Sequence, residues 1–321
     1  MDTGKGNLPG SAGATVIDGN GLADALHRRL TIEVRELASA SVRPGLATLL
    51  VGEDYPAQVY ERRVRSLAAE LDCHYVCEQH PGDAALADVL ATLGKLNADP
   101  RITGILVLRP LPPQVPEVDL YSILDSTKDI EAVTPVNAGL LAQGRPRFIP
   151  STPASCFHML DAYVASTGRD PTAFYDGLTI VLVGRSNNVG KPAVWLGLQR
   201  NATVVSAHHY THEAGRLSDF TRHADILIVA CGVPGLVTGA MVREGVIAVD
   251  VGINPVRDEA TGKMHLVGDL EFRSVAAKAE AISPVPGGVG PITDIWLLHN
   301  TVRAAAMAAR VEPLTNFGMM P

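Results

Sequence analysis

Short apolar segments of strand-forming residues alternate with amphipathic stretches along most of this chain. In the first half these segments are LATLLV (46–51), HYVC (74–77) and GILVL (104–108). In the second half they are LTIVLV (178–183), ATVVSA (202–207), DILIVA (225–230) and VIAVDV (246–251). Strands that are apolar on both faces and separated by helices are typical of parallel sheets covered on both sides. The alternation therefore predicts an α/β fold.

The apolar segments fall into two groups that divide near residues 145–155. A chain of 321 residues is long enough for two ordinary domains, each with its own core. We assign residues 14–150 to the first and 151–290 to the second, which reads as a Rossmann-type parallel sheet. A last helix over 291–310 is interpreted as packing back on the first domain. The glycine-rich residues 1–13 are expected to form a flexible extension.

The net charge of the chain limits the classes of molecule that it is expected to bind. It has 34 acidic and 27 basic residues and a net charge of −7, so binding to nucleic acid or to an anionic membrane is not expected. No apolar run approaches the ~20 residues of a membrane span. The four cysteines form no C-x-x-C pair, which favours a reduced, cytoplasmic protein.

Two groups of cysteine and histidine residues have the spacing of metal ligands. Cys73 and Cys77 alternate along a strand-like segment and read as small buried residues. His208 and His212 are four residues apart, but a loop is expected after the preceding strand, so they would not share a helix face. No metal site is therefore predicted.

One segment, IVLVGRSNNVGKPAVWLGL (180–198), combines a strand, a tight turn and a helix start. Gly184 permits the turn, and Gly190 allows the helix to approach the sheet closely. The helix N-terminus then offers free N–H groups and a positive dipole end to a phosphate. Ser186 stands where the dinucleotide fingerprint usually has a second glycine. The segment favours a dinucleotide-binding turn, and an ordinary strand-to-helix connection is the alternative.

The next strand ends in SAHHYTH instead of the acidic residue that holds an NAD ribose. Arg185 and His209 would tolerate a 2′-phosphate there, which favours NADP while NAD stays open. After the following strand, ACGVPG (230–235) brings main chain close to a flat group, either the adenine or the nicotinamide end of the cofactor.

Longer motifs resemble the bifunctional methylenetetrahydrofolate dehydrogenase/cyclohydrolase family. They are VGRSNNVGKP, ADILIVACGVPGLVTGAMVREGVIAVDVGIN, VGDLEF and PVPGGVGPIT in the second half, and PGLATLLVGEDYPAQVY, LNADPRITGILV, PLP, KDIEAVTPVNAGLL and PSTP in the first. The resemblance covers roughly residues 14–305. It implies a folate-binding substrate domain, a Rossmann-type NAD(P)-binding domain, an active-site cleft between them and a homodimer.

On the substrate side, the resemblance implies that Tyr60 is the tyrosine that stacks on the folate. Val64 and Leu108 stand where the family has the lysine that activates water and the glutamine bonded to it. The neighbours Arg63 and Arg65 point about 100° away from Val64 on a helix, so neither simply replaces the lysine.

A second departure lies in the family's D-x-D-G motif, which reads DIEA in this chain. Asp129 is kept, whereas the pterin-binding aspartate is Glu131 and the glycine is Ala132. Arg109 occupies a normally apolar position. This cation is either neutralised by Glu131 or a substrate carboxylate, or directed to solvent.

The remaining implied contacts come from the second domain. The PVPGGVGP loop contributes Pro286, Gly287 and Gly288 on the folate side. Asp294 follows near a helix start, where it can cap the helix or complement its dipole. The cofactor side comprises Gly184, Arg185, Ser186, Asn187, Val189, Gly190, His209, Cys231, Gly232, Val233 and Ile253.

These departures lead to a specific hypothesis. Oxidation of 5,10-methylenetetrahydrofolate transfers a hydride to nicotinamide and mainly requires two rings to be positioned. Hydrolysis of the methenyl cation requires a base that activates water, which valine and leucine do not provide. We predict an NAD(P)-dependent dehydrogenase whose cyclohydrolase activity is lost or very weak. Two alternatives are a dehydrogenase or imine reductase acting on a non-folate C–N substrate, and a non-catalytic folate- or NADP-binding protein.

Overall fold

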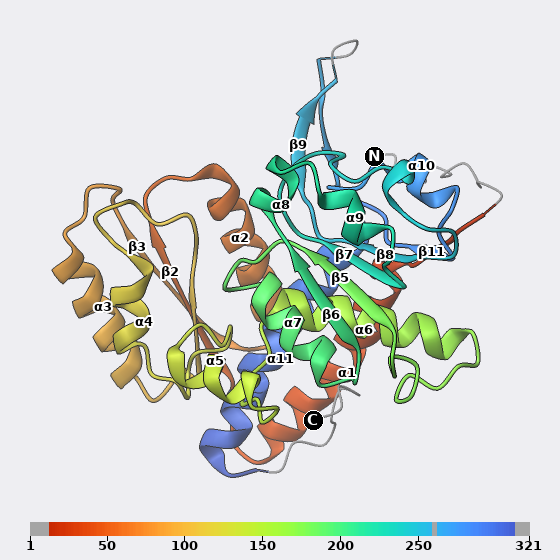
Figure 1. Ribbon diagram of the computed structural model, residues 1–321. Helices are drawn as coiled ribbons and strands as arrows, with labels where there is room; N and C mark the ends of the chain where they lie inside the picture. Colours follow the sequence, from red (N-terminus) through yellow and green to blue (C-terminus); the bar gives the residue numbers. More distant parts are fainter. Residues whose placement is uncertain (1–12, 259–261, 312–321) are drawn as a thin grey trace.

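The computed structural model describes residues 13–258 and 262–311, and its strands form two parallel sheets and one hairpin (Figure 1). The first sheet has the order β3 (His74–His80), β2 (Gly45–Val51), β4 (Gly104–Val107). The second has the order β1 (Thr15–Val16), β11 (Ala281–Ile282), β8 (Ile247–Asp250), β7 (Ile226–Val229), β5 (Thr179–Val183), β6 (Thr203–Ala207). The antiparallel hairpin joins β9 (Asn254–Arg257) to β10 (Met264–Val267).

Helices cover both parallel sheets, as the apolar strands require. Those of the first domain are α2 (Tyr55–Glu70), α3 (Leu86–Ala98), α4 (Glu117–Ile123) and α5 (Pro135–Ala142). Those of the second are α7 (Gly190–Leu198), α8 (His209–Glu213), α9 (Leu217–Thr221), a 3-10 turn (Gly239–Met241) and α10 (Phe272–Ala276). The two-domain α/β architecture predicted from the alternation is therefore confirmed.

Three long helices lie between the two sheets in Figure 1: α1 (Gly19–Ser39), α6 (Ser151–Ser166) and α11 (Val289–Ala309). They pack on one another, and α11 also contacts α2, β2 and β4. One continuous apolar core joins the inner faces of both sheets through these helices. The two domains thus share a core, which fixes the start of α11 beside α2.

Several details differ from the sequence-based expectations. The last helix begins at Val289 instead of after Pro291, because proline is tolerated where helical N–H groups have no partner. Residues 15–16, assigned to the first domain, pair with β11 in the second sheet. The expected loop after β6 is the short helix α8, so that expectation was wrong. The extension over residues 1–13 lies outside the described part except for Gly13, and no described helix is long and apolar enough to cross a membrane.

Candidate active site

The turn between β5 and α7 is shaped by two glycines. Gly184 has a φ of 128°, and a Cβ at this residue would lie 2.2 Å from the carbonyl oxygen of Ala230. A Cβ at Gly190 would lie 2.2 Å from the carbonyl oxygen of Gly184. Neither position accepts a side chain without displacement of main chain. The main chain therefore forms a close-fitting cradle at the N-terminus of α7, where a dinucleotide phosphate fits.

Side chains of the same turn hold its residues in place. The Ser186 hydroxyl oxygen accepts a hydrogen bond from the N–H of Val189 at 3.2 Å. The Asn187 side-chain oxygen accepts one from the Lys191 ammonium at 2.7 Å. Ser186 thus supports the turn through its hydroxyl group where the usual fingerprint has glycine.

The two basic residues predicted for the ribose end gather around one aromatic ring. The Arg185 guanidinium carbon lies 5.8 Å from the centroid of the Tyr210 ring, and the His209 ring lies 5.2 Å from it. His209 also contacts the Glu213 carboxylate at 3.0 Å, one turn further along α8. The structure brings Arg185 and His209 together around Tyr210, with the Glu213 carboxylate beside His209.

The loop after β7 is held by a buried carboxylate that the sequence analysis did not single out. Asp269 accepts hydrogen bonds from the N–H groups of Cys231 at 2.7 Å and Gly232 at 2.9 Å. Its other oxygen accepts one from the Asn254 side-chain amide at 2.8 Å. The VGDLEF motif contains Asp269 and was the available signal. The main-chain N–H groups of Cys231 and Gly232 therefore already donate to Asp269 and are not available to a ligand.

Two predicted cofactor residues near this loop expose apolar side chains. Val233 is 45% exposed and Ile253 is 57% exposed. Exposed branched side chains can cover a flat ring once a ligand is bound. The structure leaves both residues accessible at the end of the second sheet.

On the substrate side, the two positions that are predicted to differ from the family carry apolar side chains. Val64 on α2 and Leu108 after β4 are 1% and 3% exposed, and both belong to the shared core. Tyr60, one turn before Val64, is half-buried and packs against the same core. Neither Val64 nor Leu108 can accept or donate a proton.

An ion pair lies beside Tyr60 that the sequence analysis did not foresee. Arg63 Nε lies 2.8 Å from Asp294 Oδ2, and Arg63 Nη2 lies 3.1 Å from Oδ1. The Arg63 guanidinium carbon is 5.4 Å from the centroid of the Tyr60 ring. Residues three apart share a helix face, which explains how Arg63 reaches Tyr60 although it points away from Val64.

One sequence-based interpretation changes accordingly. Asp294 does not cap α11, because it lies six residues after the N-cap Gly288 and bonds to Arg63. The guanidinium of Arg65, the other arginine beside Val64 in the sequence, pairs with Glu61 at 2.7 Å.

Glu131 is the second carboxylate whose charge acts on Tyr60. Its carboxylate accepts a hydrogen bond from the N–H of Ser151 at 3.1 Å. Burial raises the pKa of Glu131 to about 7, and the Ser151 hydrogen bond and Arg109 oppose this rise. Burial, followed by the nearby charges of Asp294 and Glu131, also raises the pKa of Tyr60. The two carboxylates therefore both act electrostatically on the Tyr60 hydroxyl group.

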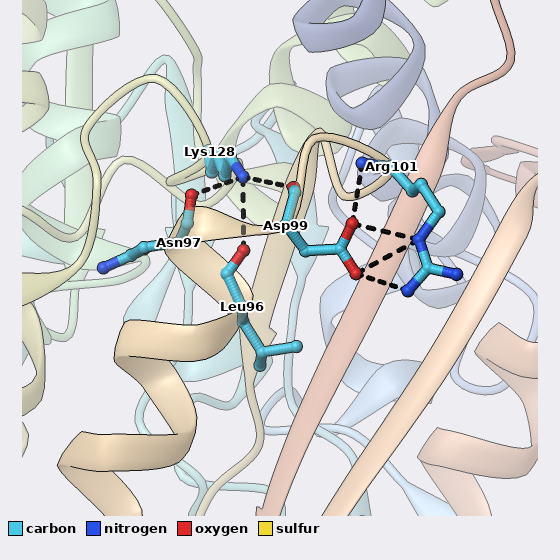
Figure 2. A network of polar contacts seen from close by, with 5 residues as sticks. All are labelled: Leu96, Asn97, Asp99, Arg101 and Lys128. Atoms are coloured by element: carbon cyan, nitrogen blue, oxygen red, sulfur yellow. Dashed lines mark hydrogen bonds and ion pairs between the residues drawn. The ribbon is translucent and has the colours of Figure 1, made fainter.

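The segment that carries Glu131 is anchored by its neighbour Lys128. The Lys128 ammonium donates to the carbonyl oxygens of Leu96 at 3.2 Å, Asn97 at 2.6 Å and Asp99 at 2.8 Å (Figure 2). These carbonyls terminate α3, where a cation is favourable. Asp99 is fixed in turn by Arg101 at 2.7 Å. The lysine of this motif is therefore structural.

Asp129 has a structural role as well, although it matches the first aspartate of the family's D-x-D-G motif. Its carboxylate is fully buried and accepts hydrogen bonds from the N–H groups of Val133 and Thr134 and from the Asn137 side-chain amide. The following Ala132 has a φ of 49°, a left-handed conformation that glycine adopts without strain. The local backbone is thus the one a glycine motif would produce.

Arg109 is neutralised, but by a residue other than those anticipated. Arg109 Nε lies 3.5 Å from the Glu117 carboxylate of α4, and its side chain is 27% exposed. A cavity of about 450 Å³ opens beside this pair between α4, α5 and α7. Its lining among the described residues includes Ala132 and Lys191 but neither Tyr60 nor Asp294. The cavity therefore reaches the nucleotide turn, which contributes Asn187 and Asn188 to its lining.

The PVPGGVGP loop packs tightly on the start of α1. The Gly287 carbonyl oxygen accepts the N–H of Gly19 at 2.9 Å. A Cβ at Gly288 would lie 2.4 Å from the carbonyl oxygen of Pro284. The loop leads directly into α11, so its packing on α1 also helps to set the position of Asp294.

Two family models match the chain: the catalytic domain of tetrahydrofolate dehydrogenase/cyclohydrolase over residues 17–131 and its NAD(P)-binding domain over residues 150–309. The bifunctional protein FolD 3 of Rubrobacter xylanophilus is 64% identical over 293 residues, which cover 91% of this chain and 92% of that protein.

Solved structures agree with these matches. The bifunctional FolD enzyme of Campylobacter jejuni is 36% identical with a TM-score of 0.83, covering 92% of this chain and 99% of that one. The Trypanosoma brucei FolD, solved with NADP and an inhibitor, is 32% identical with a TM-score of 0.85, covering 94% and 100%. This chain belongs to the tetrahydrofolate dehydrogenase/cyclohydrolase family.

Proposed function

We propose that this protein is a methylenetetrahydrofolate dehydrogenase that uses NADP and whose cyclohydrolase activity is lost or very weak. One observation carries the proposal: the positions of the water-activating lysine and its glutamine partner are Val64 and Leu108, buried in the apolar core. The close-fitting glycines Gly184 and Gly190, which are proposed to hold the cofactor, support the dehydrogenase half of the proposal. The site therefore keeps the means to position two rings and lacks the usual means to activate water.

The cofactor is proposed to lie on the second domain. Its pyrophosphate would meet the N-terminus of α7 beside Gly184 and Gly190, and its 2′-phosphate would meet Arg185 and His209. Bound nicotinamide supplies the hydride acceptor. The close-fitting glycines, the clustered basic residues and the NADP bound to the Trypanosoma brucei relative support this assignment.

The substrate is proposed to lie against Tyr60 and Glu131 of the first domain. Glu131 offers a carboxylate to the amino and ring N–H groups of a pterin, with one methylene more reach than aspartate. In the reaction, a C–H bond of the one-carbon bridge breaks and both electrons leave with the hydrogen. The bridge remains as an N–C–N cation, and no proton needs to be moved in this step.

Hydrolysis of that cation requires a group that removes a proton from water. Asp294 lies beside Tyr60, which precedes the family's lysine position by one helical turn, but its carboxylate accepts a hydrogen bond from Arg63 and forms an ion pair with it. The guanidinium thus engages both carboxylate oxygens, although burial raises the pKa of Asp294 to about 6. The geometry therefore favours hydride transfer over water activation.

The proposals for location, oligomeric state and partners follow from the family resemblance. We propose a cytoplasmic homodimer that acts on a small-molecule folate and binds neither nucleic acid nor membrane. The net charge of −7 and the absence of basic runs support the last two points.

The proposal is tested with the purified protein, methylenetetrahydrofolate, and NADP or NAD. We expect reduced NADP to form faster than reduced NAD and methenyltetrahydrofolate to accumulate. If neither cofactor is reduced, calorimetric titration with NADP and then folate separates a non-folate dehydrogenase, which binds NADP alone, from a silent folate-binding protein, which binds folate.

A further inference from the structure

The charges of two carboxylates, Asp294 and Glu131, and of one guanidinium, Arg63, act on Tyr60. The guanidinium pairs with Asp294. Asp294 comes from α11 and pairs with Arg63 of α2, whereas Glu131 comes from the segment between β4 and α5. Arg109, the other basic residue of this region, pairs with Glu117 instead. With both carboxylates ionised, the immediate surroundings of the ring carry a net negative charge.

The Arg63–Asp294 pair is asymmetric in its exposure. The Asp294 side chain is 7% exposed, whereas that of Arg63 is 54% exposed. Arg63 therefore reaches in from the surface and holds the carboxylate at two points, while water has little access to Asp294. One hydrogen bond and a second close contact to the same guanidinium fix both the position and the orientation of the carboxylate.

We propose that Asp294, held by Arg63, stabilises the cationic product of hydride transfer through its charge and does not act as a base. This inference rests on the proposed function, because it assumes a folate whose one-carbon bridge gains positive charge. A fixed carboxylate with little access to water interacts with a developing cation more strongly than it would in bulk solvent. A positively charged lysine at the position of Val64 would repel that cation, and valine carries no charge.

Asp294 must be ionised to act in this way. The charged group that faces it is Arg63 of α2, and the charges of Asp294 and Glu131 both act on Tyr60 of the same helix. The groups of α1 and α6 that face α11 are Glu33, Arg29 and His158, and they act on His299, five residues further along the helix. Burial raises the pKa of Asp294 to about 6, and Arg63 opposes the rise. Hydride transfer should therefore decline as the pH falls through about 6.

The test compares wild type with Asp294→Asn, which keeps the side-chain shape and removes the charge. The first readout is calorimetric binding of methenyltetrahydrofolate, a cation, and of folic acid, which lacks the cationic bridge. We expect the variant to lose roughly 10-fold in affinity for the cation and less than about 2-fold for folic acid, since only the charged bridge interacts with the carboxylate. Equal losses, or no loss for the cation, would overturn the proposal.

The second readout is the pH profile of the dehydrogenase reaction. We expect kcat of Asp294→Asn to fall roughly 10- to 100-fold and its acid limb near pH 6 to disappear, because one charge–charge interaction in the transition state is lost. Asp161→Asn is the matched control: Asp161 pairs with Arg200 at 3.0 Å within the second domain, away from Tyr60. This control should keep the wild-type profile.

A further variant guards against misfolding of Asp294→Asn. In Arg63→Gln the carboxylate remains but loses the group that lowers its pKa, so the acid limb should move to higher pH. An unmoved limb contradicts the proposal. So does wild-type hydrolysis of methenyltetrahydrofolate that Asp294→Asn abolishes, since Asp294 would then be a base. Failure of wild type to reduce NADP refutes the proposed function, whereas the binding comparison still decides the role of Asp294.

Discussion

On the second-domain side of the site, the turn between β5 and α7 is shaped by main chain within seven consecutive residues, Gly184 to Gly190. On the first-domain side, the surroundings of Tyr60 are assembled from side chains of α2, α11 and the segment before α5. The first wall follows the general dinucleotide fingerprint apart from Ser186, and the second is predicted to depart from the family at Val64, Leu108 and Glu131.

The two sides therefore depend on different physical features. A main-chain cradle depends on conformation and close approach, so almost any substitution at its glycines removes it. A wall of side chains can exchange a charge for an apolar group and gain an ion pair elsewhere without disturbing the fold. The predicted cofactor side therefore depends on the conformation of the main chain, and the predicted substrate side depends on the charges of its side chains.

The largest expected effect comes from Gly190→Ala. Its Cβ would lie 2.2 Å from the Gly184 carbonyl oxygen, so the turn must shift. We expect NADP affinity to fall by more than about 100-fold, because the N–H groups of the helix start lose their alignment. Gly94→Ala on α3, where a Cβ meets nothing within 4 Å, is the control. Calorimetry with NADP measures both, and near wild-type binding by Gly190→Ala would refute the cradle.

A smaller effect, confined to the substrate wall, is expected from Glu131→Gln. The amide cannot accept from both N–H donors of a pterin as a carboxylate does, so KM for methylenetetrahydrofolate should rise roughly 30-fold. NADP affinity should not change. Glu271→Gln removes a carboxylate that likewise accepts a main-chain N–H, from Ser274 at 2.8 Å, and should leave KM unaltered. A parallel loss of NADP affinity in Glu131→Gln would mean that the two walls are not independent.

Arg185→Ala should alter the choice of cofactor. Without the guanidinium beside Tyr210, NADP affinity should fall roughly 10-fold, and NAD affinity should change little, because only NADP carries the 2′-phosphate. Arg216→Ala serves as the control, since Arg216 stacks on Phe220 in a similar way at 5.4 Å. Equal losses for both cofactors would place Arg185 away from the 2′-phosphate.

The smallest effect on activity is expected from Glu33→Gln, which lies outside both walls. Burial raises the pKa of Glu33 from 4.5 to about 7. Between these values the folded state binds more protons than the unfolded state, so stability falls as pH rises and stays low above about 7. Glu33→Gln should thus be more stable than wild type at pH 8, by at most about 3 kcal/mol, and equal to it near pH 4.

Urea unfolding at the two pH values measures this difference, with exposed Glu244→Gln as the control. Unchanged dehydrogenase activity in Glu33→Gln would show that Glu33 contributes to the stability of the core and not to the reaction. A stability difference of the same size at both pH values would instead show that Glu33 does not titrate as its burial implies.

Much of the fold could be predicted from local sequence, because apolar strands and the Gly184–Gly190 turn carry their signals within a few residues. The Arg63–Asp294 pair could not, since its partners are 231 residues apart and meet only when α11 packs beside α2. The Arg109–Glu117 pair likewise depends on how α4 lies against the end of β4. The motif alone also does not reveal that Lys128 and Asp129 are structural, because their partners lie in α3 and at the start of α5.

The central claim is that the wall around Val64 permits hydride transfer and does not activate water. Its most direct test is the rate at which methenyltetrahydrofolate disappears when it is incubated with the wild-type protein in the absence of nicotinamide. We expect the rate to equal that of buffer alone, in a preparation that oxidises methylenetetrahydrofolate with NADP. Decay that accelerates in proportion to enzyme concentration would contradict the account.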